Sequence, residues 1–316
     1  PDPTHNGTQM DIARAPVIFS GHNERAIVAL CRFFASVGQE FFLIAAHSSD
    51  VIFQTAWANR VLIVRQSARL SLDLMANAAK AISAQGFKPC LCPTSEFLNQ
   101  FFFENHAALV EQKWIWLFPS LEVYLALSDK TKSPVHINRI IGLQSPASQK
   151  ENAWQAPCVL KPRSNVHEGR VLYPKLCRNE SELQGALREI DPGQWFSQVW
   201  VEGQSLYLCA YLDGQGGWDA FWQENMLQQP NGKSIVLARL CDNPGVDIKQ
   251  LMDGLWRMNY RGPFMMEMIR DHQDVLHFIE INPRFWGPLD LARKACPAIL
   301  HRFLSDMNNE SLPTQP

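Results

Sequence analysis

Four short, mostly apolar runs in the first hundred residues are separated by stretches in which apolar residues recur at helical spacing. The runs lie at 16–20, 41–45, 61–64 and 89–93, and the helical stretches lie at 27–38 and 70–85. A run of four or five apolar residues is typical of a buried strand, whereas apolar residues three or four positions apart are typical of an amphipathic helix. Gly38 and Gly86 stand where each helix would end. The pattern therefore predicts four strands and two helices.

Strands that alternate with helices form a parallel sheet covered by helices. We therefore predict a Rossmann-like domain over residues 16–118, preceded by a flexible polar arm over residues 1–15. The turn after the first strand, Ser20 to Arg25, holds one glycine instead of the G-x-G-x-x-G pattern. A dinucleotide site is therefore not supported. The domain is interpreted as a scaffold, with ligand binding beyond its strand ends as the alternative.

An aromatic segment and a further helix follow this domain. The aromatic residues between 96 and 118 fit a packed helix and strand better than a cofactor site. Pro119 opens a connector. A helix is predicted to begin at Ser128-Asp129-Lys130, with Ser128 or Asp129 as its N-cap, and to end between residues 142 and 146.

The second half of the chain predicts a mixed arrangement of strands and helices. Apolar runs predict strands at 158–162, 196–212, 218–223 and 234–240, and helical spacing predicts helices at 180–190 and 247–259. Two further apolar strands flank the polar turn 271–274, which predicts a closing hairpin. The fold class predicted for the whole chain is therefore an α/β domain followed by an α+β region.

Two carboxylates and an amide stand in this otherwise apolar hairpin. A loop of four residues, 271–274, would place Glu267 opposite Phe278. Because side chains alternate along a strand, Glu267, Phe278, Glu280 and Asn282 would then share one face. The Cα atoms of the two glutamates would lie about 7–8 Å apart, which allows both to contact the same metal ions. A loop with an odd number of residues would separate these faces.

Buried carboxylates need a compensating charge, because an unpaired buried carboxylate costs several kcal/mol or becomes protonated. Oxygen ligands without thiolate or imidazole suit Mg²⁺ or Mn²⁺. The sequence therefore predicts a metal site formed by Glu267, Glu280 and Asn282. The alternative is that both glutamates lie on a solvated face and that Asn282 only begins a turn before Pro283.

Composition narrows the class of protein. The chain has 316 residues, 46% of them hydrophobic and 19% charged, with a formal net charge of -2. This is the composition of a globular protein, and the near-neutral balance argues against a nucleic-acid partner. No apolar run approaches the roughly 18–20 residues that span a membrane. The eight cysteines are scattered, which predicts reduced thiols in a cytoplasmic protein.

The closing hairpin resembles the metal-binding end of the ATP-grasp superfamily. The resemblance is carried by Glu267 and by the segment F-I-E-I-N-P-R-F-W-G at 278–287. It extends over most of the chain, with the Rossmann-like region resembling the N-terminal domain of the family. Four further segments resemble family motifs: 92–96 before the connector, 128–130 and 159–162 with the two ATP-contacting lysines, and 197–203 as the strand beside adenine.

The resemblance implies a role for each matching residue. Lys130 and Lys161 would contact the ATP phosphates. Residues Gln198, Val199, Trp200 and Val201 would lie against adenine, and Glu202 would bind the ribose hydroxyls. Glu267, Glu280 and Asn282 would hold one or two Mg²⁺ (or Mn²⁺) ions at the β- and γ-phosphates. Arg284, Lys161 and Arg239 would contact the transferring phosphoryl group or a carboxylate.

One segment departs from the pattern of the family. Members often carry several glycines after the second lysine, in a loop that closes over the phosphates. Here residues 162–170 contain one glycine. Side chains of Arg163, Ser164, Asn165 or His167 would have to substitute for the backbone contacts of a glycine-rich loop. Movement of this loop is a hypothesis suggested by its polar content.

The resemblance implies an ATP-dependent ligase that converts a substrate carboxylate to an acyl phosphate, with ADP as product, for attack by an amine. It divides the chain after residue 118 into a connector and lid subdomain, 119–197, and a central subdomain with the metal site, 198–316. The partners would be a small carboxylate and an amine, an amino acid among the candidates, with a homodimer as the family-based expectation. The alternatives are an ATP-binding regulatory protein without catalysis and a kinase that stops at the acyl phosphate.

Overall fold

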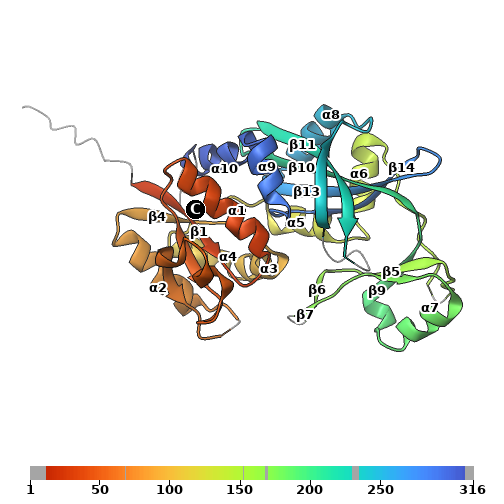
Figure 1. Ribbon diagram of the computed structural model, residues 1–316, viewed down its shortest axis with the longest axis horizontal. Coiled ribbons are helices and arrows are strands. Elements are labelled where there is room, and N and C mark those ends of the chain that lie inside the picture. Colours follow the sequence, from red (N-terminus) through yellow and green to blue (C-terminus); the bar gives the residue numbers. More distant parts are fainter. Residues whose placement is uncertain (1–11, 68, 152, 168–169, 230–234, 310–316) are drawn as a thin grey trace, which may run out of the picture.

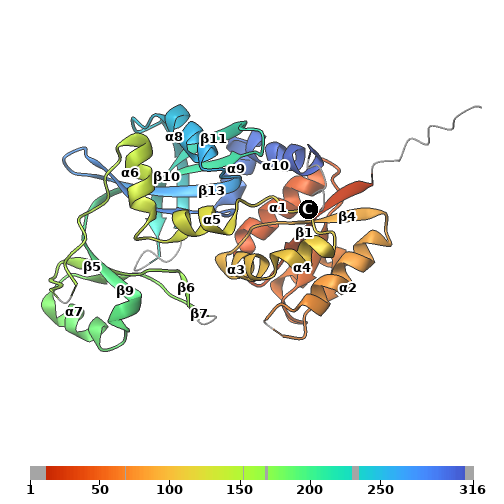
Figure 2. The ribbon, with the colours of Figure 1, turned by 180° about the vertical axis from the view of Figure 1, so that it is seen from behind.

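The chain folds into three units that are arranged around one antiparallel sheet (Figure 1). The structure is a computed structural model, and it describes residues 12–67, 69–151, 153–167, 170–229 and 235–309. The N-terminal unit, red to orange in Figure 1, and a small green unit lie at opposite ends of the molecule, as the reverse view in Figure 2 also shows. The mixed α/β architecture predicted from the sequence is confirmed.

The N-terminal unit is a four-stranded parallel sheet with the strand order β3-β2-β1-β4. Its elements are β1 (Ala13–Phe19), α1 (Glu24–Ser36), β2 (Phe42–Ala45), the short 3-10 helices η1 (Val51–Gln54) and η2 (Ala58–Arg60), β3 (Val61–Val64), α2 (Leu72–Ser83) and β4 (Phe87–Leu91). The predicted arm is shorter than expected, because Ala13 to Ala15 already pair with β4. The rest of that arm, residues 1–11, lies outside the described residues.

Four helices connect the N-terminal unit to the rest of the chain: α3 (Glu96–Glu104), α4 (His106–Glu111), α5 (Leu121–Ser128) and α6 (Ser133–Ile141). The aromatic segment packs into the core of the N-terminal unit, as predicted. The helix predicted to begin at Ser128 does not begin there, because α5 ends at that residue. Asp129 instead forms a turn: its Oδ1 accepts hydrogen bonds from the backbone N–H and the hydroxyl of Thr131 at 2.8 and 2.6 Å. Lys130 therefore lies in a tight turn between two helices.

The central unit is an antiparallel sheet with the strand order β12-β11-β10-β13-β14. Its elements are β10 (Gly203–Leu212), β11 (Trp218–Gln228), β12 (Ile235–Cys241), α8 (Ile248–Arg257), β13 (Gly262–Asp271) and β14 (Leu276–Asn282). One face of the sheet, with Leu208 and Met266, packs against α5, α6 and α8 in a single apolar core. The opposite face is therefore left for the N-terminal unit, the C-terminal helices and the site.

The small unit, which we call the lid unit (residues 147–199), carries its own sheet with the order β8-β5-β9. Its elements are β5 (Cys158–Pro162), the hairpin strands β6 (Val166–His167) and β7 (Arg170–Val171), β8 (Lys175–Cys177), α7 (Glu180–Leu187), η3 (Pro192–Gln194) and β9 (Trp195–Val199). The chain enters and leaves this unit through two segments that are hydrogen-bonded to each other. The backbone N–H of Gln149 donates to the carbonyl of Ser197 at 2.8 Å, and the backbone N–H of Val199 donates to the carbonyl of Ala147 at 2.9 Å. The predicted boundary at 197/198 therefore falls inside β9.

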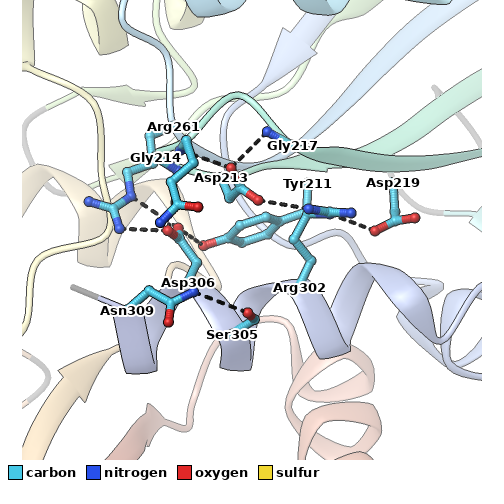
Figure 3. A network of polar contacts seen from close by, with 11 residues as sticks. Tyr211, Asp213, Gly214, Gly217, Asp219, Arg261, Arg302, Ser305, Asp306 and Asn309 are labelled. Atoms are coloured by element: carbon cyan, nitrogen blue, oxygen red, sulfur yellow. Dashed lines mark hydrogen bonds and ion pairs between the residues drawn. The ribbon is translucent and has the colours of Figure 1, made fainter.

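Two C-terminal helices that the sequence pattern did not predict, α9 (Leu289–Ala295) and α10 (Ala298–Asn309), join the N-terminal unit to the central sheet. Phe303 of α10 packs against Phe34 of α1, with ring centroids 6.2 Å apart. A polar network fastens the same helix to the sheet (Figure 3). In it the buried Asp306 accepts hydrogen bonds from the Tyr211 hydroxyl at 2.8 Å and from Arg261 Nη2 at 2.6 Å. The N-terminal and central units therefore share one continuous core.

All eight cysteines lie among the described residues, and none of them forms a disulfide. Within the part of the chain that the structure describes, every helix is too short or too polar to cross a membrane.

Candidate active site

A cavity of about 590 Å³ opens where the N-terminal unit, the lid unit and the central sheet meet. Each unit supplies one wall. Its lining includes residues of the turn after β1, the start of α3, the turn before α6, β5 and the loop after it, β9 and the segment after it, and the closing hairpin: His22, Glu96, Lys130, Lys161, Asn165, Gln198, Val199, Trp200, Val201, Glu267, Ile279, Glu280, Asn282 and Arg284. Most of the predicted site residues therefore lie in this cavity.

The closing hairpin reaches the cavity in a register that differs from the predicted one. The backbone N–H of Asp271 donates to the carbonyl of Val275 at 2.9 Å, so the loop holds three residues, 272–274, not four. Met268 consequently lies opposite Phe278, and both side chains are buried in the helix-covered core. The prediction that Phe278 shares a face with the carboxylates is therefore wrong, because an odd loop shifts the pairing by one residue.

A β-bulge near Ile279 brings the carboxylates together in spite of this shift. The bulge adds one residue to β14 between two paired positions, and an added residue reverses the alternation of side chains. Glu267 therefore lies directly opposite Glu280, closer than the predicted diagonal. Ile279, Glu280 and Asn282 all line the cavity. Two deviations from a regular hairpin thus cancel, and the predicted convergence of the three oxygen-bearing side chains is present.

Two buried lysines lie close to this pair of carboxylates. Lys161 comes from β5 and Lys130 from the turn before α6, and their side chains are only 6% and 4% exposed. Lys130 Nζ lies 2.6 Å from Glu280 Oε2, and Asn282 Nδ2 donates to Glu280 Oε1 at 2.8 Å. The arrangement gathers two positive and two negative groups around one space, with a low exposure that strengthens each interaction.

Burial and mutual charge shift the pKa values within this cluster. Burial, together with the neighbouring Glu280, raises the pKa of Glu267 to about 7. Burial alone would raise the pKa of Glu280 as well, but the ammonium groups of Lys130 and Lys161 outweigh it and lower that pKa to about 2. Burial and the nearby Lys130 lower the pKa of Lys161 to about 8. Glu267 is thus the carboxylate whose charge is least compensated by the protein alone.

The hinge segment, residues 198–201, comprises the end of β9 and the two residues after it, and it forms the apolar end of the cavity. Gln198, Val199, Trp200 and Val201 all line it, and Val199 leaves 43% of its surface exposed. The side-chain amide of Gln198 is anchored by donation to the carbonyl of Pro146 at 3.2 Å. A flat ring would find apolar side chains and strand backbone together here.

Two predicted residues do not reach the cavity. Glu202 lies on the exposed surface beyond the hinge segment. Arg239 on β12 is 63% exposed in its side chain and forms an ion pair with Glu224 at 2.6 Å. The structure therefore does not bring Arg239 to the charged cluster, because β12 lies at the far edge of the central sheet from β14.

Arg284 lies at the opposite end of the cavity, next to the N-terminal unit. Its Nε lies 3.7 Å from Glu96 Oε1 at the start of α3. Asn165 of the lid unit donates to the same carboxylate oxygen at 2.7 Å. His22 follows β1 and packs against the ring of Phe97 at 5.2 Å. The N-terminal unit is thus a wall of the site and not only a scaffold.

Sequence reasoning gave no role to Glu96 or His22. Glu96 ends the segment 92–96, but no local pattern shows that its carboxylate faces Asn165 and Arg284, which lie 69 or more positions away in the chain. A signal for His22 was present, because it lies just beyond the carboxyl end of a parallel strand, where ligand sites of open α/β sheets occur.

The donor set fits a hard divalent cation. Glu267, Glu280 and Asn282 offer oxygen atoms only, which suits Mg²⁺ or Mn²⁺ and not a thiolate-preferring metal. The raised pKa of Glu267 shows a carboxylate that a bound cation would compensate. Among the described residues, no cluster of three or more histidine, cysteine, aspartate or glutamate side chains forms a metal cage. A cation here would therefore complete its shell with phosphate oxygens or water.

No protein-family model and no curated protein matches this sequence. Solved structures do match over nearly the whole chain. The biotin carboxylase of Campylobacter jejuni, in complex with β,γ-ATP, gives a TM-score of 0.69 at 16% identity, covering 96% of this chain and 73% of that chain. The N5-carboxyaminoimidazole ribonucleotide synthetase of Thermotoga maritima gives a TM-score of 0.59 at 14% identity, covering 96% and 78%.

A third matching structure was solved with bound nucleotide and a bound anion. The biotin carboxylase domain of the 2-oxoglutarate carboxylase of Hydrogenobacter thermophilus was solved as a dimer with MgADP, ADP and bicarbonate, and it gives a TM-score of 0.66 at 16% identity, covering 95% of this chain and 71% of that chain. At such identities the likeness establishes the fold. The chain has the ATP-grasp fold that its sequence motifs indicated.

Proposed function

We propose that this protein is an ATP-dependent ligase that activates a substrate carboxylate as an acyl phosphate for attack by an amine. One observation carries the proposal: Lys130, Lys161, Glu267 and Glu280 converge in a cavity walled by all three units of an ATP-grasp fold. Polyphosphate and divalent cations bind together, and this cluster offers a matched set of charges to both. The ATP- and Mg-bound forms of the similar structures support the same assignment.

Each wall would bind a different part of the reactants. The hinge segment 198–201 would bind adenine, and Lys130 and Lys161 would neutralise the phosphate oxygens. Glu267, Glu280 and Asn282 would hold Mg²⁺ or Mn²⁺, which supplies charge neutralisation at the transferred phosphoryl group. Arg284, at the end nearest the N-terminal unit, would bind the substrate carboxylate.

The proposed reaction has two displacements. A carboxylate oxygen attacks the γ-phosphorus, the bond from that phosphorus to the β,γ-bridging oxygen breaks, and ADP leaves. The amine nitrogen then attacks the acyl carbon, the bond from that carbon to the phosphate oxygen breaks, and the nitrogen loses a proton. The residues of the chain hold the reactants in line and exclude water from the acyl phosphate. This exclusion requires the lid unit to cover the cavity.

The test is product analysis with purified protein, ATP, Mg²⁺ and a panel of carboxylates and amines, amino acids included. We expect carboxylate-dependent release of ADP and phosphate, with an amide product visible by mass spectrometry. Release of AMP and pyrophosphate would contradict the proposed chemistry. ADP release without ligation to any amine or thiol would instead identify a kinase, and ATP binding without carboxylate-dependent ADP release a regulatory protein.

The proposal includes a homodimer, for which the dimeric state of the Hydrogenobacter thermophilus domain is the support. A mass near twice the 35.9 kDa of the chain in analytical ultracentrifugation would agree with it. A cytoplasmic location remains a prediction from the free thiols.

A further inference from the structure

The loop after β5, residues 162–170, contains one glycine, and only one of its four candidate polar side chains reaches the cavity. Arg163 donates to the carbonyl of Gly193, and Ser164 donates to that of Val166, so both bond within the lid unit. His167 is exposed. Asn165 lines the cavity. Its backbone carbonyl accepts a hydrogen bond from the backbone N–H of Leu172 at 2.8 Å, which fixes Asn165 to the β6–β7 hairpin.

The side chain of Asn165 contacts both other units. Its Nδ2 donates to Glu96 Oε1 of the N-terminal unit at 2.7 Å and to Asn282 Oδ1 of the central unit at 3.5 Å. A single amide nitrogen has two hydrogens, so it can serve both acceptors. Figures 1 and 2 show the β6–β7 hairpin extending from the lid unit toward the N-terminal unit. Asn165 is thus a meeting point of the three walls.

The contact with Asn282 extends into the charged cluster. Asn282 donates its own amide hydrogen to Glu280 at 2.8 Å, and Glu280 pairs with Lys130 at 2.6 Å. Because Nδ2 of Asn282 is directed to Glu280, its Oδ1 is directed to Asn165. A chain of polar contacts therefore runs from Glu96 through the lid unit to the residues that would hold the cation.

We propose that Asn165 is a positioning residue that couples closure of the lid unit to the orientation of Asn282. The inference rests on the proposed function of the site. The Asn165–Glu96 hydrogen bond holds the lid loop against the N-terminal unit, and the same amide keeps Oδ1 of Asn282 on the cavity side. One side-chain amide here joins the lid unit to both other walls of the cavity.

The test is a double-mutant cycle on the Asn165–Glu96 contact. Asn165→Asp places two carboxylates at hydrogen-bond distance, and their repulsion opens the lid unit. Asn165→Asp in a Glu96→Gln background restores a donor and an acceptor, because the glutamine amide donates to the new carboxylate. The matched control is Asn179→Asp, which makes the same change at the N-cap of α7 in the lid unit, where aspartate also caps well.

Two readouts separate positioning from a general loss of structure. The first is hydrogen exchange of the β6 and β7 amides in the protein without nucleotide. We expect faster exchange in Asn165→Asp, near-normal exchange in the double variant, and no change in Asn179→Asp. The second is the dissociation constant of a non-hydrolysable ATP analogue with Mg²⁺, which should rise at least ~10-fold in Asn165→Asp and far less when Glu96→Gln is already present.

Equal effects of Asn165→Asp in both backgrounds, on exchange and on affinity, would overturn the inference. Failure of the proposed function looks different: the analogue would not bind to the unaltered protein, while the exchange cycle would still report the contact. Normal binding of the analogue with an additive cycle would leave the proposed function standing and reject the role of Asn165.

Discussion

At the scale of single residues, the site is defined by two lysines and two glutamates whose charges compensate each other only in part before any ligand binds. Lys130 pairs directly with Glu280. Glu267 and Lys161 keep shifted pKa values, because burial destabilises their charged forms more than the opposite charges nearby stabilise them. A cation would compensate Glu267, and a phosphate would compensate Lys161. The residues that the protein alone stabilises least are thus those that the proposed ligands would stabilise most.

Replacing Glu280 should remove turnover in a protein that still folds. Glu280→Gln keeps the side-chain volume and an acceptor for Asn282, but it removes the charge that faces Lys130. We expect carboxylate-dependent ADP release to fall by about 10²–10³-fold, the range for losing one preorganised electrostatic group. The matched control is Glu224→Gln, a glutamate of the same sheet that pairs with Arg239 outside the cavity. Full activity in Glu280→Gln would contradict the assigned role.

Affinity for an ATP analogue with Mg²⁺ should be highest between about pH 7 and 8. Below about pH 7 Glu267 becomes protonated and cannot bind the cation, and above about pH 8 Lys161 loses the charge that attracts phosphate. Affinity should therefore approach a tenfold loss per pH unit on either side. Isothermal titration from pH 5.5 to 9.5 measures both limbs.

Two variants assign the limbs to these residues. Both variants should weaken binding. Glu267→Gln should remove the acid limb of the pH profile and keep the alkaline limb, whereas Lys161→Met should remove the alkaline limb and keep the acid limb. A profile that stays flat across the whole range would show that neither residue contacts the bound ligands.

At the scale of elements, the β-bulge at Ile279 decides whether the hairpin has a functional face. The loop of three residues would turn Glu280 away from Glu267, and the extra residue in β14 turns it back. Phe278, just before the bulge, is buried on the other face, while Glu280 lines the cavity. The bulge thus takes up Ile279, so that Phe278 and Glu280, which are two positions apart, lie on opposite faces.

Deleting Ile281 should abolish nucleotide binding. Without Ile281, Glu280 and Asn282 become consecutive, and consecutive side chains of a strand lie on opposite faces, so the two cannot both reach the cavity. Thermal shift with the ATP analogue and Mg²⁺ measures the loss, and circular dichroism reports whether the sheet remains. Deleting Ile279 is the control: it removes only the bulge, leaves Glu280 opposite Glu267 and should preserve binding. A variant without Ile281 that binds like the unaltered protein would contradict the placement of Glu280 and Asn282.

The strands and the chemistry of the hairpin could be predicted from local pattern, because burial and alternation are properties of a few consecutive residues. The bulge could not, since it follows from how β14 pairs with β13. The turn at Asp129 was mistaken for a helix start because aspartate suits both an N-cap and a turn. The contacts of Glu96 and Asn165 depend on residues far away in the chain, so no local signal shows them.

At the scale of the whole molecule, the C-terminal helices make two of the three units one body. Phe303 packs against Phe34 of the N-terminal unit, and Asp306 accepts hydrogen bonds from Tyr211 and Arg261 of the central unit (Figure 3). Among its described residues, the lid unit has a small separate core of five buried side chains. The walls that carry Glu96 and Glu280 are therefore fixed relative to each other, and the third wall is attached separately.

Asp306→Ala should lower the free energy of unfolding by about 3 kcal/mol. The substitution leaves the buried Tyr211 hydroxyl and Arg261 without this acceptor, and breaking a buried charge pair costs this much even when one partner keeps some contact with water. Urea unfolding followed by circular dichroism measures the change. Ser305→Ala, an exposed position on the same helix, should have no effect of this size. Equal midpoints for the two variants would show that the network contributes little.

The paired segments 147–149 and 197–199 that attach the lid unit have a consequence for the order of events. A two-stranded ribbon flexes across its flat side and resists sliding in its plane, because sliding would stretch its hydrogen bonds. Rotation about such a pivot barely displaces Val199, which belongs to it, and Trp200, which follows it, but moves β6 and β7 much further, because they extend away from it toward the N-terminal unit (Figure 1). The surface that binds the base of a nucleotide would then be preformed, while the triphosphate end of the cavity is still open to incoming reactants.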